Sequence, residues 1–135
     1  MKDSAVVTIP SDPKYLSVIR AVTGTMAEIY GMTGGGVEEV KLAVDEACSN
    51  VIKHAYRGDR GRRIVVKFSL KKGFEVVIED SGVKARPESI EGRSLDDVRP
   101  GGLGIHLIRR ACDVLAFDKS KKRGNRLRLV RKREE

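Results

Sequence analysis

The stretch that decides the fold is residues 44–56, which read Val-Asp-Glu-Ala-Cys-Ser-Asn-Val-Ile-Lys-His-Ala-Tyr. It closes a predicted helix of about residues 37–56, whose residues we place on a wheel at about 100° each. The apolar positions then share one arc, which we expect to be buried: Val40, Val44, Ala47, Val51 and Ala55. Glu46, Asn50 and Lys53 fall together on a narrow stripe beside that arc, at the margin of the predicted core.

The pair Glu46 and Asn50 stands at positions i and i+4, so both side chains share one helix face. An Asn amide oxygen suits Mg²⁺, which takes oxygen ligands and usually keeps several waters beside substrate phosphates. A carboxylate one turn earlier could orient or deprotonate a nucleophile. The same spacing is also that of an ordinary solvated polar stripe, and the pattern by itself leaves both interpretations open.

The segments around this helix alternate between strand and helix patterns. Residues 5–9 form a short apolar run that predicts a strand. Steps of three and four from Leu16 to Ile29 predict a helix, which Gly34–Gly36 would break. Residues 64–70 and 74–80 each alternate in hydrophobicity on either side of a short connection, so together they predict a hairpin.

Asp80 is the chemically notable residue of this hairpin. It continues the parity of Phe74, Val76 and Ile78, so its carboxylate is expected on the core side of the sheet. A buried carboxylate needs a partner, and the exocyclic amine of a ligand base would serve. The sequence Asp80-Ser81-Gly82 is equally compatible with an Asx-type turn that closes the strand.

From about residue 81 to 102 no periodicity is visible, and loops of this length in a small domain are often functional lids. Gly101-Gly102-Leu103-Gly104 then opens a predicted helix that runs to Cys112. Glycines let backbone N–H groups approach closely, and a helix N-terminus favours phosphate. A flexible loop with a helix cap would look the same. The stretch is neither a Walker A loop nor a dinucleotide-binding fingerprint.

The last part of the chain predicts a further pair of strands. Residues 114–117 read as a strand and residues 121–125 as a turn, after which Leu127 and Leu129 alternate with Arg126 and Arg128. The predicted order is therefore β-α-α-β-β-lid-α-β-β. This order favours an α+β fold, a two-layer α/β sandwich with a mixed, mostly antiparallel sheet and three helices on one face.

Composition excludes several classes of protein. A chain of 135 residues predicts one domain. Cys48 and Cys112 lie far apart without a CxxC motif, which argues against a disulfide scaffold and a four-cysteine zinc site. No segment has the pattern of a secretory signal or a membrane span, so a cytoplasmic location without membrane contact is expected. His54 and His106 have no accompanying ligand set and are expected to bind no metal.

The formal net charge is +8, and the excess of basic residues lies after residue 60, most densely from Lys119 to Arg133. Such a run could hold a polyanion. Aromatic residues make up only 4% of the chain and none lies within the run, so it lacks stacking platforms for single strands. A charged edge strand, or a surface for an acidic protein, explains the run better, and no direct nucleic-acid contact is expected.

Taken in order, these motifs resemble those of the GHKL ATPase superfamily, which includes gyrase, Hsp90, histidine kinases and MutL. Within it, the chain resembles the small anti-sigma-factor serine kinases of the RsbW and SpoIIAB type. The resemblance covers nearly the whole chain. It implies the Bergerat α/β sandwich as a single histidine-kinase-like ATPase domain over residues 1–135, with a lid at about residues 83–102.

The resemblance also implies roles for individual residues. Asn50 matches the Mg²⁺ ligand that serves the phosphates, and Glu46 matches the catalytic Glu that accepts the serine hydroxyl proton. Lys53 stands where relatives often reach a phosphate. Asp80 matches the Asp that binds the adenine amino group, with Gly82 beside it. The stretch expected to bind ATP phosphates and close the lid is Gly101, Gly102, Leu103 and Gly104.

The implied function is that of a Mg·ATP-dependent protein serine/threonine kinase. It would phosphorylate an anti-anti-sigma partner of the STAS type, bind a sigma factor, and use ATP and Mg²⁺; the resemblance leaves a homodimer open. The chain departs from relatives after Gly82, where Val-Lys-Ala-Arg-Pro keeps the proline but lacks the Phe-Asp that many show. No phosphoacceptor histidine helix precedes the domain, which disfavours a sensor histidine kinase. The alternatives are a non-catalytic ATP-binding partner-switching module and a basic nucleic-acid binder.

Overall fold

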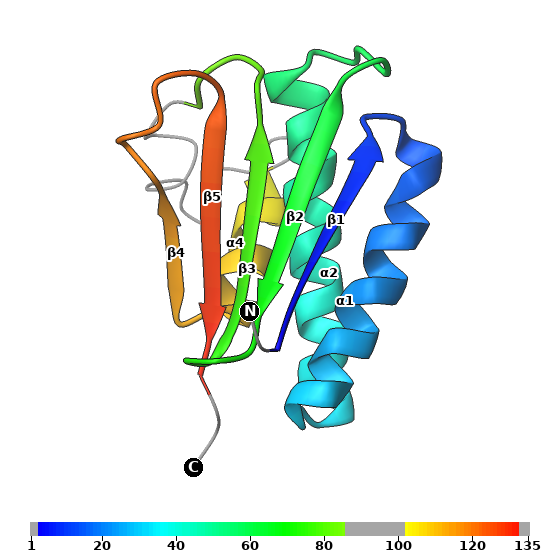
Figure 1. Ribbon diagram of the computed structural model, residues 1–135, viewed down its shortest axis with the longest axis vertical. Coiled ribbons are helices and arrows are strands. Elements are labelled where there is room, and N and C mark those ends of the chain that lie inside the picture. Colours follow the sequence, from blue (N-terminus) through cyan, green and yellow to red (C-terminus); the bar gives the residue numbers. More distant parts are fainter. Residues whose placement is uncertain (1–2, 86–101, 133–135) are drawn as a thin grey trace.

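The chain folds into two layers, a five-stranded sheet and a layer of helices on one of its faces (Figure 1). The computed structural model describes residues 3–85 and 102–132. The strands are β1 (Ser4–Pro10), β2 (Arg63–Ser69), β3 (Phe74–Asp80), β4 (Val114–Phe117) and β5 (Asn125–Arg131). The helical elements are a 3-10 turn η1 (Pro13–Tyr15), α1 (Leu16–Tyr30), α2 (Gly34–Asn50), a π-helical turn η2 (Val51–Ala55) and α4 (Gly102–Ala111). The predicted order of strands and helices and the α+β class are confirmed.

The sheet runs in the order β1-β2-β3-β5-β4, and its four neighbouring pairs are all antiparallel. The expected antiparallel character is confirmed, whereas no parallel pair of the expected mixed sheet occurs among the described strands. The reason is that β5 lies between β3 and β4, so the crossover through α4 joins strands that are not neighbours. Asp80 at the end of β3 thereby stands directly opposite Asn125 at the start of β5.

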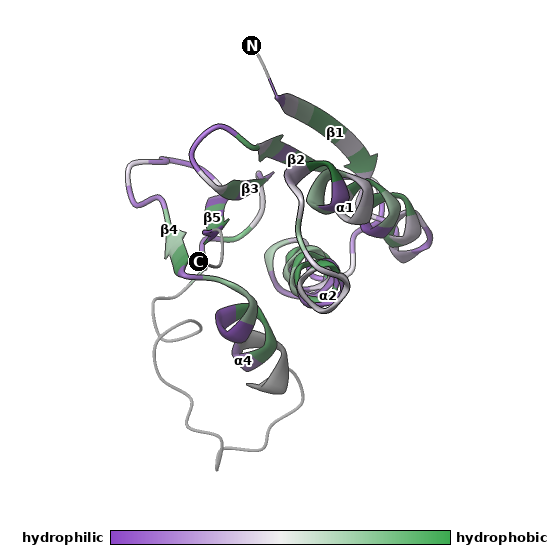
Figure 2. Cartoon of the chain, turned by 90° about the horizontal axis from the view of Figure 1, so that it is seen from below, coloured by the Kyte–Doolittle hydropathy of each residue, from purple (hydrophilic) through white to green (hydrophobic). Residues whose placement is uncertain are grey.

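The core lies between the sheet and the helices. Phe74, Val76 and Ile78 of β3 are buried with alternating parity, and Asp80 follows with the same parity, as predicted. The helices cover this face and leave the other face open, with α2 lying between α1 and α4 (Figure 2). Burying each large apolar side chain contributes about 1.5–3 kcal/mol, so this interface holds the two layers together.

The break between the first two helices lies earlier than predicted. Gly34–Gly36 do not separate the helices but form the first turn of α2. The end of α1 is set by Gly31, whose φ of 93° is left-handed and whose N–H donates to the Glu28 carbonyl. Because the left-handed residue already reverses the chain, the three glycines are free to start the next helix.

The second helix departs from a regular α-helix after Asn50. Its last turn is η2, in which the N–H of Tyr56 donates to the carbonyl of Val51, five residues earlier. A π-helical turn carries an extra residue and is often found at functional sites. The extra residue shifts the phase of the helix, so the predicted stripe of three polar side chains ends at Asn50, and Lys53 is exposed.

The basic segment near the end of the chain is also placed differently than expected. Asn125 begins β5 rather than ending a turn, and β5 is an inner strand, so the predicted charged edge strand is wrong. The physical reason is that β4 pairs on the outer side of β5. Arg126 and Arg128 lie on the open face of the sheet and pair with Glu79 and Glu75 of β3.

Part of the predicted lid cannot be placed. Of the segment 83–102, residues 86–101 lie outside the described residues, and with them Gly101. Within residues 3–85 and 102–132, no helix is both long and apolar enough to cross a membrane.

Candidate functional site

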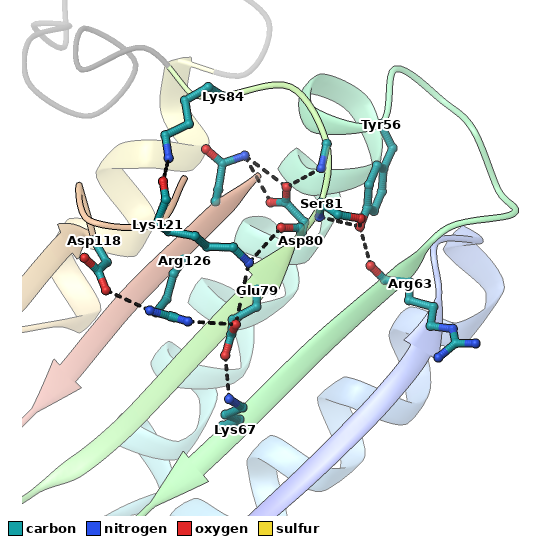
Figure 3. A network of polar contacts seen from close by, with 12 residues as sticks. Tyr56, Arg63, Lys67, Glu79, Asp80, Ser81, Lys84, Asp118, Lys121 and Arg126 are labelled. Atoms are coloured by element: carbon teal, nitrogen blue, oxygen red, sulfur yellow. Dashed lines mark hydrogen bonds and ion pairs between the residues drawn. The ribbon is translucent and has the colours of Figure 1, made fainter. Parts of the chain in front are cut away.

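Asp80 is a carboxylate buried at the end of an inner strand, with 5% of its surface exposed. Its Oδ1 accepts hydrogen bonds from Gly82 N at 2.9 Å and from Asn125 Nδ2 at 3.0 Å, and its Oδ2 lies 3.2 Å from the same Nδ2 (Figure 3). Burial raises the pKa of Asp80, and these donors together with Lys121 partly oppose the rise. A carboxylate can accept about four hydrogen bonds, and these contacts use two positions on Oδ1 and one on Oδ2.

The turn after Asp80 packs directly against the end of the second helix. The N–H of Val83 donates to the carbonyl of Ala55 at 2.8 Å. A Cβ atom added at Gly82 would lie 2.3 Å from that carbonyl oxygen and 2.6 Å from its carbon. The bond from Gly82 to Asp80 is the Asx-type turn considered from the sequence. The glycine is therefore required because two backbones meet here.

Tyr56 ties the same turn to the second strand. Its hydroxyl accepts a hydrogen bond from Ser81 N at 2.9 Å and donates one to the carbonyl of Arg63 (Figure 3). The guanidinium of Arg62 lies 4.8 Å from the centre of the Tyr56 ring and donates to the Ser81 carbonyl at 3.0 Å. The end of η2, the start of β2 and the end of β3 are thus held by one buried phenol.

Replacing Tyr56 with phenylalanine is expected to lower the free energy of unfolding by about 1–3 kcal/mol, because the Ser81 N–H and the Arg63 carbonyl both lose their partner. Urea unfolding followed by circular dichroism measures the change. The matched control is Tyr15→Phe in η1, a half-buried residue outside this network, and this variant should cost less than about 0.5 kcal/mol. Equal losses in the two variants would contradict this role of Tyr56.

The two flanks of α2 can be told apart by their ion pairs. Asp45 binds Arg20 of α1, with 2.7 Å between Oδ1 and Nη1. On the opposite flank Glu39 binds Arg131 at 3.2 Å, and the same guanidinium donates to the carbonyl of Ala111, the last residue of α4. One flank of α2 therefore faces α1, and the other faces α4.

Glu46 and Asn50 lie on the flank of α2 that faces α4. They follow Glu39 by seven and eleven residues, intervals that return to the same side of an α-helix. Both side chains are half-buried, as expected for the margin of the core. The structure thus keeps the two residues together and places them beside α4.

The N-terminus of α4 lies level with these two residues. The helices run antiparallel (Figure 1), and Arg131 contacts both Glu39 and Ala111, so those two residues lie at about the same level along the helix pair. Counting along both helices at about 1.5 Å per residue brings Gly102 to the height of Cys48, within the polar turn of α2. A helix start presents unpaired N–H groups and the positive end of its dipole, which favour an anion.

The structure describes the positions of all but one of the remaining predicted site residues. Leu103 and Gly104 belong to the first turn of α4 together with Gly102. Gly101 lies outside the described residues, and Lys53 stands exposed on η2, past the end of the polar stripe. The end of β3, the end of η2 and the start of β5 lie at the same end of the molecule (Figure 1).

Sequence reasoning missed several residues of this site. Asn125 is 6% exposed and binds Asp80, whereas the sequence pattern predicts a turn at this residue. Extending the parity of Leu127 and Leu129 back by two residues would have placed it on the core side. Gly124 was missed as well: its φ is 66°, and a Cβ there would lie 2.0 Å from the Asp80 carbonyl oxygen. These two residues bring β5 against the end of β3.

The donor set suits a cation that takes few ligands from protein. The described residues contain no group of three or more His, Cys, Asp and Glu side chains that could hold a metal ion. Asn50 offers an amide oxygen on the half-buried flank of α2, which fits Mg²⁺ bound mainly by water and phosphates. Burial raises the pKa of Cys48 to about 12 and that of Cys112 to about 11, so neither supplies a thiolate.

The open face of the sheet carries a separate network centred on Glu79. Its carboxylate lies 2.6 Å from Lys67 Nζ, 3.4 Å from Arg126 Nη2 and 3.6 Å from Lys121 Nζ (Figure 3). Lys67 above all, together with Arg126, holds the pKa of Glu79 below its usual value. Arg126 also binds Asp118 at 2.9 Å. Lys121 and Arg126, two cations of the basic segment, therefore form ion pairs within the fold.

The fold belongs to a known class of domain. Residues 9–131 match the family model described as the histidine kinase-like ATPase domain. The chain belongs to this family, and the resemblance seen in the sequence is confirmed.

Among curated proteins, the chain is similar to several named serine-protein kinase RsbW. It is 34% identical over 115 residues to the one from Halalkalibacterium halodurans, which covers 78% of this chain and 70% of the relative. The protein from Bacillus pumilus is 30% identical over 116 residues, covering 78% and 72%. The protein from Bacillus subtilis (strain 168) is 28% identical over 114 residues, covering 78% and 71%.

Proposed function

We propose that this protein is an ATP-binding anti-sigma regulatory factor that phosphorylates a serine or threonine of an anti-anti-sigma, STAS-type partner. The observation that carries the proposal is the buried carboxylate of Asp80, which lies at the end of β3, at the same end of the fold as the end of the second helix. Membership in the ATPase family supports nucleotide binding. The name of the relatives, serine-protein kinase, supports transfer to a protein hydroxyl.

In this proposal the two ends of the nucleotide are bound by different elements. Asp80 accepts a hydrogen bond from the adenine amino group, and Gly82 keeps the turn close to the helix so that the base can reach it. The first turn of α4, with Gly102 and Gly104, faces the phosphates with backbone N–H groups. Lys53, Gly101 and Leu103 complete the proposed ATP-binding set.

The chemical step is assigned to the polar turn of α2. Asn50 would hold Mg²⁺, which neutralises charge on the phosphates. Glu46 would accept the proton of the attacking hydroxyl and orient it toward the terminal phosphate, so that positioning and electrostatics provide most of the rate.

The proposal extends to the setting of the reaction. We place it in the cytoplasm, in a single domain of residues 1–135 with a lid at residues 83–102, and we include a sigma factor as the second partner. The resemblance leaves a homodimer open, and light scattering at several concentrations tests for one.

Asp80→Asn is the variant that tests the nucleotide site. The amide NH₂ of the new side chain would oppose the NH₂ of Asn125 or the adenine amine, so ATP affinity should fall by about 10- to 100-fold, as expected for a hydrogen bond to a charged group. Isothermal titration calorimetry with Mg·ATP measures the change. Asp45→Asn is the matched control, because that carboxylate binds Arg20 on the α1 side of the fold.

The outcomes separate the candidate functions. ATP binding by the wild type and by Asp45→Asn, with weak binding by Asp80→Asn, supports the proposed site. Absence of ATP binding by the wild type would overturn the proposal. Binding without any transfer of the terminal phosphate to a STAS partner would leave an ATP-dependent partner-switching module instead of a kinase.

A further inference from the structure

Both the amide nitrogen and the amide oxygen of Asn125 have hydrogen-bond partners, although the residue lies outside every motif noted in the sequence. Its Nδ2 donates to Val83 O at 2.9 Å and lies 3.0 and 3.2 Å from the two carboxylate oxygens of Asp80. Its Oδ1 accepts a hydrogen bond from Ala85 N at 2.7 Å. A single buried amide therefore joins the start of β5 to the end of β3 and to the backbone that follows it.

The four contacts fix which way the amide points. Ala85 N needs an acceptor and Val83 O needs a donor, so Oδ1 and Nδ2 can take only one arrangement. A flipped amide would set its oxygen against both the Val83 carbonyl and the Asp80 carboxylate. The two Nδ2 hydrogens are then fully assigned, one to Val83 O and one shared between the oxygens of Asp80.

A hydrogen shared between both carboxylate oxygens controls the rotation of the carboxylate. Turning Asp80 about its last side-chain bond would lose the contact to Asn125 and also the bond from Gly82 to Oδ1. Held in this way, the carboxylate presents Oδ2 in one fixed direction, with Asn125 Nδ2 at 3.2 Å on one side. A carboxylate held by Gly82 alone would be free to present either oxygen at another angle.

We infer that Asn125 is a positioning residue that sets the purine specificity of the site, an inference that rests on the proposed binding of ATP. A 6-amino purine donates to Oδ2 from its exocyclic amine. A 6-keto purine places an oxygen there, which is repelled, but it carries an N1–H donor that a rotated carboxylate could accept. By preventing that rotation, Asn125 selects 6-amino purines over 6-keto purines.

The test compares ATP with inosine triphosphate, which differs from ATP in carrying an oxygen in place of the amine. Dissociation constants for both nucleotides, with Mg²⁺, are measured by calorimetry on wild type, Asn125→Ala and Arg126→Ala. The wild type should prefer ATP by about 10- to 100-fold, and Asn125→Ala should lower this preference by about tenfold. Arg126→Ala alters the neighbouring residue of β5 on the opposite face and should keep the wild-type preference.

A second variant guards against loss of folding in Asn125→Ala, which circular dichroism would reveal. Asn125→Asp has the same shape and still accepts from Ala85 N, but it cannot donate to Asp80. At alkaline pH, where the two carboxylates repel, it should also lose preference for ATP over inosine triphosphate.

Each outcome bears on a different claim. Equal binding of both nucleotides by the wild type, or no binding, would overturn the proposed nucleotide site itself. A wild type that prefers ATP, with folded Asn125 variants that weaken both nucleotides equally and keep the preference, would overturn the inference for Asn125 and leave the proposed function standing.

Discussion

Glu46→Gln is expected to lower the rate of phosphate transfer to the protein partner by about 10²–10⁴-fold, the range that a positioned general base contributes. The substitution keeps the size of the side chain and its place on the half-buried flank of α2, but it removes the proton acceptor. ATP affinity should change by less than about threefold, because the residues proposed to bind the adenine and the phosphates are unchanged in this variant. Transfer of labelled phosphate to a purified STAS partner measures the first quantity, and calorimetry measures the second.

The matched control for this variant is Glu38→Gln, on the same helix. Glu38 is largely exposed and lies 3.6 Å from Lys41 on the surface of α2, so its loss should leave both transfer and ATP affinity unchanged. Transfer by Glu46→Gln at the wild-type rate would remove Glu46 from the mechanism. A parallel loss of ATP affinity would show that the residue serves binding instead.

The burial of Asp80 shows what hydrophobic alternation can predict. The period of two along β3 continued unbroken through residue 80, so the side of the sheet that the carboxylate faces followed directly from the sequence. The line of Glu46 and Asn50 followed in the same way from the period of the helix. Both predictions depend on local geometry, which repeats along a single element.

The partners of these residues could not be predicted in that way. Asn125 meets Asp80 only because β5 inserts between β3 and β4, a pairing between residues 45 positions apart that no local pattern specifies. The dipeptide Gly124-Asn125 also has strong turn propensity, so the local sequence favours a turn over the strand that begins there. The position of the basic segment also depends on the strand order, since an inner strand and an edge strand can have the same sequence pattern.

The predicted helix boundaries were wrong for a different reason. Gly34–Gly36 have low helix propensity, yet they form the first turn of α2, because Gly31 had already ended the preceding helix and tertiary packing overrides propensity. The π-helical turn at η2 is stabilised by contacts from elsewhere in the chain, such as the bond from Val83 to Ala55. Such contacts are visible only once the strands are in place.

Gly82→Ala is expected to disrupt both stability and nucleotide binding. Its Cβ would lie 2.3 Å from the carbonyl oxygen of Ala55, and since the obstacle is backbone, the turn itself must move. That movement breaks the bond from Val83 to Ala55 and displaces the N–H that binds Asp80. The cost should be about 3 kcal/mol, a fall of about 10 °C in Tm, with ATP affinity at least about tenfold lower.

The matched control is Gly35→Ala in the first turn of α2, where an added Cβ meets nothing within 4 Å. Alanine has the higher helix propensity, so this variant should be unchanged or more stable by up to about 1 kcal/mol, with normal ATP binding. Differential scanning calorimetry and titration with Mg·ATP measure both variants. A Gly82→Ala protein with the Tm and ATP affinity of the wild type would mean that the turn tolerates a side chain, and that its close approach to the helix does not hold Asp80 in place.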